Sequence, residues 1–364
     1  MTDINHERDR FVKNSLPDRR RFLAFASAAM AAGCTPRGSF SVAPLSDGTE
    51  GMQHILVATS RVADPAPIAY GKGRAETLEF AQLTISIPPT HKIGTIEWPP
   101  AREVDPARHF ALAGAKTLPS TKSLLKAALS GAAESGEEAV LFVHGYNNNF
   151  SEAIYRHAQI AWDYEMRGPQ IHFAWPSAAD PLEYTYDRDS VLIARDALAQ
   201  LLLDLLKEEQ LRVSVVGHSM GCLLIMEALR QIALTGDREA LNALNSITLI
   251  SPDIDMDLFR SQATALGRLP QPFIVAVARN DRLLWLSSGL SGGADRLGSL
   301  DDRDQLEALG VSTIDMTGLG NGGANHFLPG TSASAIALIK GLRETRLKPS
   351  NSLSVGPVSI SLGG

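Results

Sequence analysis

The sequence predicts an α/β protein, in which a mostly parallel sheet carries helices on both of its faces. From residue 53 onward, short β-branched apolar runs alternate with amphipathic stretches, and this alternation is typical of such a sheet. One junction between an apolar strand and an apolar helix contains the motif G-x-S-x-G, at residues 217–221. A chain of 364 residues that is 44% hydrophobic and 20% charged is long and apolar enough for one large domain with tails.

Eight segments have the composition of strands, and three stretches between them have apolar residues at helical spacing. The first two strands have no helical pattern between them, so we expect them to form an antiparallel edge. No long insertion separates SITLIS from FIVAVA, which predicts a fold without a large cap domain. The expected strands are HILVATS (54–60), TLEFAQLTISIP (77–88), AVLFVHG (139–145), IHFAWP (171–176), RVSVVG (212–217), SITLIS (246–251), FIVAVA (273–278) and VSTIDMT (311–317), and the expected helices are SEAIYRHAQIAWDYEM (151–166), DSVLIARDALAQLLLDLLKEEQ (189–210) and CLLIMEALRQIAL (222–234).

The charge and the cysteine content exclude several classes of function. A formal net charge of -6 and a pI near 5.9 provide no basic surface for phosphates, so nucleic acid is not an expected partner. The chain has only two cysteines, Cys34 and Cys222, which excludes a disulfide framework. Neither cysteine lies at a Cys/His spacing typical of zinc, so the sequence predicts no metal site.

Residues 1–34 have the layout of an export signal. Arg19, Arg20 and Arg21 precede a short apolar stretch and then small residues. This apolar stretch is too short to span a bilayer as a helix. RRRFLA resembles a twin-arginine signal, which exports folded proteins. AAGC resembles a lipoprotein box, in which Cys34 would be lipidated and anchor the protein to a membrane. The alternative is a buried amphipathic first helix, but the segment lacks the polar alternation of such a helix.

The rest of the chain divides into three parts. Residues 35–52 contain Pro, Gly and Ser without periodicity, so we expect a flexible tether. Residues 53–346 hold the alternating strands and helices of the α/β domain. Residues 347–364 are rich in Ser and Gly, and we expect a mobile C-terminal tail, in which VSISL has the composition of a short edge strand.

The motif GHSMG at residues 217–221 predicts that Ser219 is a nucleophile. At a tight strand-to-helix turn the backbone of the serine is strained, and glycines two residues before and after it remove Cβ groups that would collide with neighbouring elements. The following helix directs its N-terminus at the serine, which favours negative charge on a substrate oxygen. An isolated G-x-S-x-G is common by chance, and the alternative is a serine that only caps a helix.

Other features of the chain match the α/β-hydrolase fold, which carries its nucleophile on such an elbow. AVLFVHG ends where this fold supplies a backbone N–H to its oxyanion hole, so we expect Tyr146 and Met220 to provide the two oxyanion donors. FIVAVA leads to Asp281, where the triad acid belongs, and the Gly/Asn-rich loop after VSTIDMT contains His326. The order Ser219, Asp281, His326 along the chain is the order that this fold uses.

Each predicted triad residue has a chemical task. A serine is a poor nucleophile by itself, so Ser219 needs His326 to accept its proton, and His326 needs a carboxylate to fix its tautomer and stabilise its imidazolium. We favour Asp281 as that carboxylate because of strand order. Asp253 and Asp255 in SPDIDMD are alternatives, since they follow the preceding strand and either supply the acid or terminate that strand.

A family resemblance covers roughly residues 53–330. It is carried by HILVATSR, TISIPPTHKIGTIEWP, FVHGYNNNFSEAIYRHAQIAWD, FAWPS, VVGHSMGCLLIMEALRQ, LISPDIDMDLFRSQ and RNDRLLWLSS. Together these segments resemble the bacterial α/β-hydrolase family long catalogued as a domain of unknown function, which has esterase- and lipase-like members. The resemblance implies an eight-stranded hydrolase sheet, a triad of Ser219, Asp281 and His326, and neither a metal nor an organic cofactor. It implies no substrate.

The sequence therefore predicts an exported, lipid-anchored esterase that acts on a small-molecule or lipid-like ester through an acyl-enzyme. Thioesters and amides fit the same residues, and so does an acyltransferase, in which another acceptor replaces water. An alternative from a different class is a non-catalytic envelope protein that keeps the fold for binding, because fold alone does not define function. The complete triad favours the enzyme, since a binding domain has no need of these three residues together.

Overall fold

A computed structural model describes residues 38–43, 51–64, 68–100, 104–278, 296–297, 303–319, 326–344, 352–355 and 358–361 of the chain. All of them belong to one unit, Gly38–Gly364. Two predicted residues, Asp281 and Cys34, lie outside the described residues, as does the whole predicted export signal.

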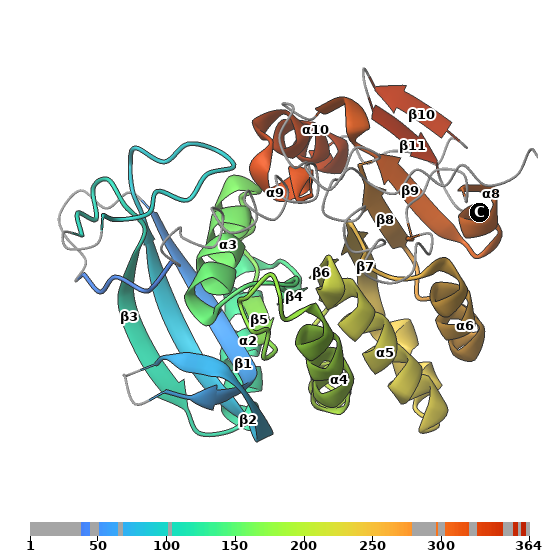
Figure 1. Cartoon of the computed structure of the whole chain (residues 1–364), viewed down its shortest axis with the longest axis horizontal. Helices are drawn as coiled ribbons and strands as arrows, with labels where there is room; N and C mark the ends of the chain where they lie inside the picture. Colours follow the sequence, from blue (N-terminus) through green and yellow to red (C-terminus); the bar gives the residue numbers. More distant parts are fainter. Residues whose placement is uncertain are drawn as a thin grey trace, which may run out of the picture. The chain divides into compact units, whose positions relative to one another are not determined.

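The described residues form one eleven-stranded sheet, in the order β10-β11-β9-β8-β7-β6-β4-β5-β1-β2-β3 (Figure 1). All neighbours from β9 across to β1 are parallel. The strands at both ends of the sheet, β2 and β3 on one side and β10 and β11 on the other, pair antiparallel. The strands are β1 (Gly51–Ala63), β2 (Tyr70–Ile87), β3 (Ala111–Leu118), β4 (Ala139–Val143), β5 (Gln170–Ala174), β6 (Val213–His218), β7 (Leu244–Ile250), β8 (Phe273–Val277), β9 (Val311–Asp315), β10 (Ser352–Val355) and β11 (Val358–Ser361).

The predicted fold class is confirmed, and the predicted number of strands is wrong. All eight expected strands are present, and the first two form the expected antiparallel edge. The three additional strands are β3, β10 and β11. β3 reads ALAGAKTL and so has almost no β-branched residues, while β10 and β11 have four residues each. β3 therefore lacks the β-branched composition from which strands are recognised. β11 lies within VSISL, which has the composition of a short edge strand but is too short to predict its place in the sheet.

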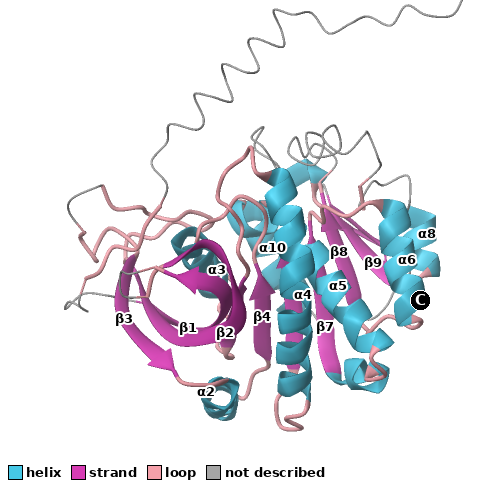
Figure 2. Cartoon of the chain, turned by 60° about the horizontal axis from the view of Figure 1, so that its bottom comes forward, coloured by secondary structure: helices cyan, strands magenta, loops and turns pink. Residues whose placement is uncertain are grey.

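Helices cover both faces of the sheet (Figure 2). Alternate residues of a strand point to opposite faces, and β4 shows this directly. Leu141 packs in the core cluster that α2, α4, α5 and α6 complete. Phe142, the next residue, packs against α3 and α10 on the other face. The helices are α2 (Thr121–Ser135), α3 (Phe150–Asp163), α4 (Tyr184–Leu206), α5 (Met220–Leu234), α6 (Met256–Leu266), α8 (Arg303–Ala308), α9 (Leu328–Thr331) and α10 (Ala333–Glu344).

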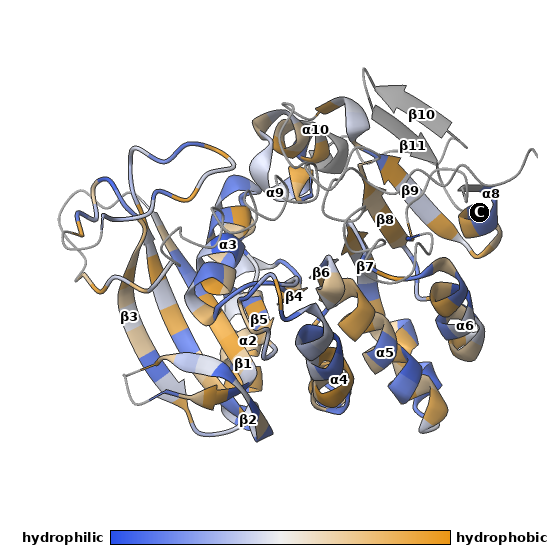
Figure 3. Cartoon of the chain, viewed as in Figure 1, coloured by the Kyte–Doolittle hydropathy of each residue, from blue (hydrophilic) through white to orange (hydrophobic). Residues whose placement is uncertain are grey.

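The distribution of apolar residues explains this layered arrangement. The parallel strands are coloured mostly as apolar in Figure 3, whereas α4 and α5 show apolar and polar residues around their circumference. A strand buried on both faces is a continuous apolar run, and AVLFV of β4 is buried at every residue. In the connection between β7 and β8, residues 251–272, the only helix is α6, as the absence of a long insertion there predicts.

Segments on both sides of the predicted domain contact it. Gly38 N–H donates to Glu152 Oε1 at 3.0 Å, and Leu112 N–H donates to the carbonyl oxygen of Ser41 at 2.9 Å. These contacts fall within residues 35–52, where the sequence suggests a tether. At the other end, β11 pairs with β9 at the position of VSISL. None of the described helices is both long enough and apolar enough to cross a membrane.

Candidate active site

Ser219 lies on a strained turn between β6 and α5. Its φ of 52° and ψ of -122° are outside the regions that a residue with a Cβ ordinarily adopts. Hydrogen bonds hold the turn, because Ser219 N–H donates to the carbonyl of Ile250 at 2.9 Å and Asp253 N–H donates to the carbonyl of Ser219 at 3.3 Å. The Ser219 side chain makes no capping hydrogen bond to α5. The interpretation of Ser219 as a mere helix cap therefore has no support in the geometry.

The two glycines of GHSMG are required by space, as the sequence predicts. A Cβ on Gly221 would lie 2.5 Å from the carbonyl oxygen of Val143, and closer still to that of His144. A Cβ on Gly217 would lie 2.5 Å from Cδ1 of Ile225. A larger residue at Gly221 would meet backbone oxygens and push α5 away from β4, whereas at Gly217 the Ile225 side chain would have to move and the Cys222 Cα would be 3.2 Å away.

The end of β4 meets the serine turn. A Cβ on Gly145 would lie 2.9 Å from the Cβ of Ser219, so the Gly145–Tyr146 backbone lies directly beside the serine. Neither Tyr146 N–H nor Met220 N–H donates a hydrogen bond to another described residue. Met220 is fully buried and Tyr146 is partly buried. The Met220 N–H, at the start of α5, has no partner within the helix. Buried N–H groups are nearly always paired, so two unpaired ones beside one serine call for an explanation. They are the two groups that the sequence predicts as oxyanion donors.

A buried polar network holds the turn after Gly145. Arg61, at 1% exposure, donates from Nη2 to the Asn148 carbonyl at 2.9 Å and from Nη1 to the Ser177 carbonyl at 3.1 Å. Asp187 accepts from Ser177 Oγ at 2.6 Å and from Asn147 N–H at 3.3 Å. Burial lowers the pKa of Arg61 to about 10, and the negative charge of Asp187 opposes that shift.

Sequence reasoning did not identify Arg61 or Asp187 as residues of the site. Arg61 was visible only as the last letter of HILVATSR, and Asp187 only as an acidic residue before a predicted helix. Trp175 closes the predicted strand IHFAWP at the same edge of the sheet, which suggests a residue that lines the pocket. The structure buries it completely, and its Nε1–H donates to the His144 carbonyl at 2.7 Å. Trp175 thereby supports the backbone at the end of β4.

His326 is brought to the serine turn through His218. His218 Nε2 lies 3.3 Å from the backbone oxygen of His326, and the two rings are 4.8 Å apart. Burial, and then the nearby charge of His326, lower the pKa of His218 well below its usual value, so His218 is neutral and its Nε2–H can donate to that oxygen. The ring of Phe327 packs 4.1 Å from His218. The predicted base therefore lies beside the residue that precedes the predicted nucleophile.

The alternative acids have other partners. Asp255 is the N-cap of α6 and accepts from Leu258 N–H at 3.0 Å. Asp253 is 3% exposed; its Oδ2 accepts from the Tyr184 hydroxyl at 2.9 Å, and its Oδ1 lies 3.3 Å from Arg296 Nε. Asp281 lies outside the described residues, so its role stays a prediction. In the described part of the chain, no cluster of three or more His, Cys, Asp or Glu side chains is placed to hold a metal ion.

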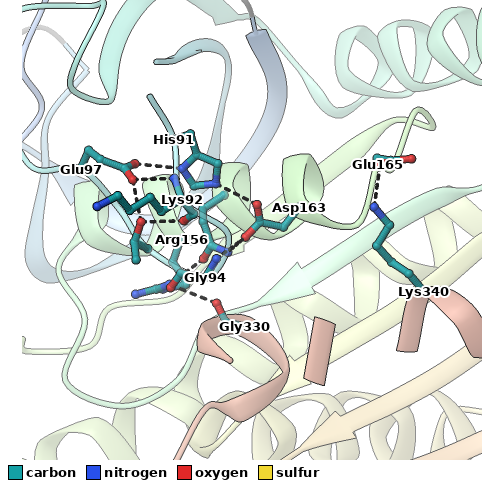
Figure 4. A network of polar contacts seen from close by, with 11 residues as sticks. His91, Lys92, Gly94, Glu97, Arg156, Asp163, Glu165, Gly330 and Lys340 are labelled. Atoms are coloured by element: carbon teal, nitrogen blue, oxygen red, sulfur yellow. Dashed lines mark hydrogen bonds and ion pairs between the residues drawn. The ribbon is translucent and has the colours of Figure 1, made fainter. Parts of the chain in front are cut away.

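A histidine between two carboxylates fixes the loop that follows β2 (Figure 4). His91 Nδ1 lies 2.9 Å from Glu97 Oε2, and His91 Nε2 lies 2.8 Å from Asp163 Oδ1 at the end of α3. Burial alone would lower the pKa of His91, but the hydrogen bonds to Asp163 and Glu97 and the charges of both carboxylates raise it above its usual value. The two carboxylates therefore favour the charged form of His91, and its ring ties this loop to α3.

The same loop reaches the short helix α9, which follows His326. Gly94 N–H donates to Asp163 Oδ2 at 2.7 Å, and Arg156 Nη1 lies 3.4 Å from the Gly94 oxygen and 3.3 Å from the Gly330 oxygen. Figure 4 shows Arg156 between these two backbone oxygens. Gly94 has a φ of +84°, and a Cβ there would lie 2.5 Å from the Thr331 oxygen. The loop thus packs against the element that carries His326.

This sheet, with a serine on the strained elbow between β6 and α5, is the α/β-hydrolase fold. The chain belongs to the family described as alpha/beta hydrolase of unknown function (DUF900), whose model matches residues 120–345. The family that the sequence segments resemble is thereby confirmed. A search of curated proteins found no match to the chain.

Several solved structures are similar to the chain at low identity. The TT1662 protein of Thermus thermophilus is 13% identical, with 59% of this chain and 90% of that chain covered and a TM-score of 0.35. A YdeN-like hydrolase of Pectobacterium atrosepticum is also 13% identical, with 62% and 99% covered and a TM-score of 0.31. Lipase B of Aspergillus fumigatus is 14% identical, with 57% and 52% covered and a TM-score of 0.32.

Proposed function

We propose that the protein is a serine hydrolase that cleaves carboxylic esters through an acyl-enzyme. Ser219 Oγ attacks the ester carbonyl while His326 accepts its proton, and the N–H groups of Tyr146 and Met220 bind the oxyanion. His326 then gives the proton to the leaving alcohol, and water releases the acyl group by the same steps. Asp281 is the carboxylate that orients His326 in this proposal.

One observation carries the proposal. Two backbone N–H groups, of Tyr146 and Met220, lack acceptors among the described residues and lie next to a serine whose backbone is strained. Unpaired donors beside a strained residue cost free energy and persist where they serve a function. An ester oxygen that becomes negatively charged on attack by Ser219 is the acceptor that suits such donors.

Labelling with a fluorophosphonate tests whether Ser219 is the nucleophile. The wild-type protein should be labelled and should hydrolyse 4-nitrophenyl esters, whereas Ser219→Ala should not be labelled and should lose at least about a thousandfold in kcat/KM. Ser251→Ala is a matched control, because Ser251 is buried, has a φ of 44° and directly follows the neighbouring strand β7. Labelling that survives in Ser219→Ala would identify another nucleophile, and a folded wild-type protein that is never labelled would favour a binding function.

The proposal extends to the location of the enzyme. The arginine cluster, the apolar stretch and AAGC at the N-terminus support export followed by lipidation of Cys34. The enzyme would then act at the bacterial cell envelope, on small-molecule or lipid-like esters.

A further inference from the structure

A small cavity lies beside the proposed nucleophile. It has a volume of about 70 Å³, and its wall includes Gly145, Asn148, Arg156 and His218. Two of these residues also border Ser219, because His218 precedes it in the chain and the Gly145 backbone contacts it. A cavity of this size holds several waters or one small polar group such as a carboxylate.

Arg156 brings a positive charge to this wall. All hydrogen bonds that Arg156 donates to described residues come from Nη1. They go to the Gly94 and Gly330 oxygens and, at 2.6 Å, to Gln159 Oε1. Nε and Nη2 donate to no residue in the described ranges, and no carboxylate of those ranges forms an ion pair with the guanidinium. The negative charge of Asp163 acts on Arg156 through space, and the two side chains are bridged by Gln159, whose amide donates to that carboxylate.

Among the described residues that line the cavity, Arg156 is the only one that carries a charge. Burial lowers the pKa of Arg156 to about 10, so it stays protonated at neutral pH. Burial also lowers the pKa of His144 to about 3 and that of His218 well below its usual value, so both histidines are neutral. The side-chain amide of Asn148 already donates to the Gly145 and Tyr146 oxygens. The cavity therefore combines a positive charge with an otherwise neutral wall.

The free edge of the guanidinium has the shape of a carboxylate receptor. Nε–H and one Nη2–H of an arginine point in parallel and match the two oxygens of a carboxylate. The contacts of Nη1 with Gly94 and Gly330 hold the plane of the guanidinium, so little side-chain entropy is lost when an anion binds.

We propose that this cavity binds a carboxylate carried by the ester substrate, and that Arg156 pairs with it. The proposal rests on ester hydrolysis at Ser219 and adds the substrate class, which is half-esters of dicarboxylic acids or other esters with a free carboxylate near the scissile bond. Arg156 in this role selects the substrate and takes no part in bond making.

Paired substrates test this specificity. The 4-nitrophenyl monoesters of glutaric, adipic and pimelic acid are compared with neutral 4-nitrophenyl alkanoates of the same chain length, and kcat and KM are measured for each. The wild-type enzyme should prefer at least one anionic ester over its neutral counterpart by tenfold or more in kcat/KM. Arg156→Gln should reduce that ratio by roughly ten- to hundredfold, mainly through KM, since a charge-assisted pair is lost. Arg156→Lys should retain part of the preference because it keeps the charge.

The ratio of kcat/KM for anionic and neutral esters distinguishes a role of Arg156 in specificity from a structural role. A variant that only displaced α9 and His326 would slow anionic and neutral esters alike and leave the ratio unchanged, which would overturn the proposal. Arg167→Gln is the matched control, because Arg167 is exposed in the loop after α3, and its ratio should equal that of the wild type. A wild-type enzyme that hydrolyses neutral esters without any preference for anionic ones would overturn the carboxylate site and leave ester hydrolysis intact.

If no ester is hydrolysed, a binding measurement tests whether the cavity binds a carboxylate. Titration calorimetry of Ser219→Ala with monomethyl adipate should show binding, and the double variant with Arg156→Gln should bind at least tenfold more weakly. Absence of binding, or equal binding by both variants, would overturn the carboxylate site whether or not the protein is an esterase.

Discussion

The backbone of Ser219 is held in a strained conformation by hydrogen bonds to the segments on either side of it. Its N–H is bonded to the end of β7 and its carbonyl to Asp253, while Gly217 and Gly221 leave space for α5 to approach. Strain of this kind costs about 1–3 kcal/mol and persists when the surroundings determine it. Ser120 at the start of α2 is a useful contrast, because it has extended backbone and accepts a capping hydrogen bond, whereas Ser219 has neither feature.

Asp187→Asn tests the network that holds the oxyanion turn. Ser177 Oγ and the N–H groups of Asn147 and Ala178 all donate to this carboxylate, and an amide NH₂ facing those donors would repel them. The change also leaves the buried charge of Arg61 without its negative neighbour. We expect the free energy of unfolding to fall by about 2–4 kcal/mol. We also expect kcat/KM for neutral esters to fall by roughly ten- to hundredfold, because the Tyr146 N–H moves.

Urea unfolding and ester turnover measure these two effects. Asp189→Asn is the control, because Asp189 is exposed two residues further along the same helix and should change neither quantity appreciably. If Asp187→Asn kept full activity and stability, the turn would be held without this carboxylate.

The strained turn at Ser219 could be predicted from sequence, whereas the residues that support it could not. GHSMG places the requirements of the turn within five consecutive residues, with steric reasons at Gly217 and Gly221. Arg61 reaches the Asn148 and Ser177 oxygens, which are 87 and 116 residues away in the chain. A contact of that kind exists only once β1, β4 and β5 lie side by side, so no local sequence pattern predicts it.

At the scale of elements, the loop after β2 connects α3 to α9. His91 and Gly94 bind Asp163 at the end of α3, and Gly94 packs against Thr331 in α9. Because α9 begins two residues after His326, the position of the predicted base depends on a loop that is distant from it in sequence.

His91→Gln tests this connection through pH. The pKa of His91 is raised in the folded state, so its contribution to stability is complete below its unfolded pKa of about 6.5 and is lost as the pH rises through the folded pKa. We therefore expect His91→Gln to lower the free energy of unfolding by about 2 kcal/mol near pH 6 and by less as the pH rises. The measurement is urea unfolding of both proteins across this pH range.

His54→Gln provides the control, because His54 is exposed on β1 and lies outside this network. The difference in the free energy of unfolding between His54→Gln and the wild type should not show the pH dependence expected for His91→Gln. A difference for His91→Gln that stays constant between about pH 6 and pH 9 would show that His91 does not act through its charge.

Strands with regular composition were predictable, and irregular ones depended on their neighbours. β4 and β6 are apolar runs that only a buried strand explains. β3 is built from small residues, and its place is set by β2, to which it pairs over most of its length. β11 is short and pairs with β9, which no longer forms the edge of the sheet. The partner strand rather than propensity determines β3, and for β11 the partner strand determines where the segment pairs.

On the scale of the whole molecule, the candidate site is assembled at one edge of the sheet. The ends of β4 and β6 bring Tyr146 and Ser219 together, and the segment after β9 brings His326. The chain order of these residues predicted this convergence, since parallel strands place their carboxyl ends at the same edge. The carboxylate that orients His326 stays a prediction. Strand order favours Asp281.

Fractionation of a bacterium that produces the full chain tests the proposed location. A single acyl chain holds a protein on a bilayer only marginally, and two chains hold it stably, so a lipidated Cys34 with two chains should place the protein in the membrane fraction. Cys34→Ser removes the acceptor and should shift the mature protein to the soluble exported fraction. Replacing Arg19 and Arg20 with lysine should instead leave an unprocessed precursor in the cytoplasm. Protein that stayed in the membrane fraction after Cys34→Ser would contradict the lipid anchor at Cys34. Wild-type protein found only in the cytoplasm would contradict export itself.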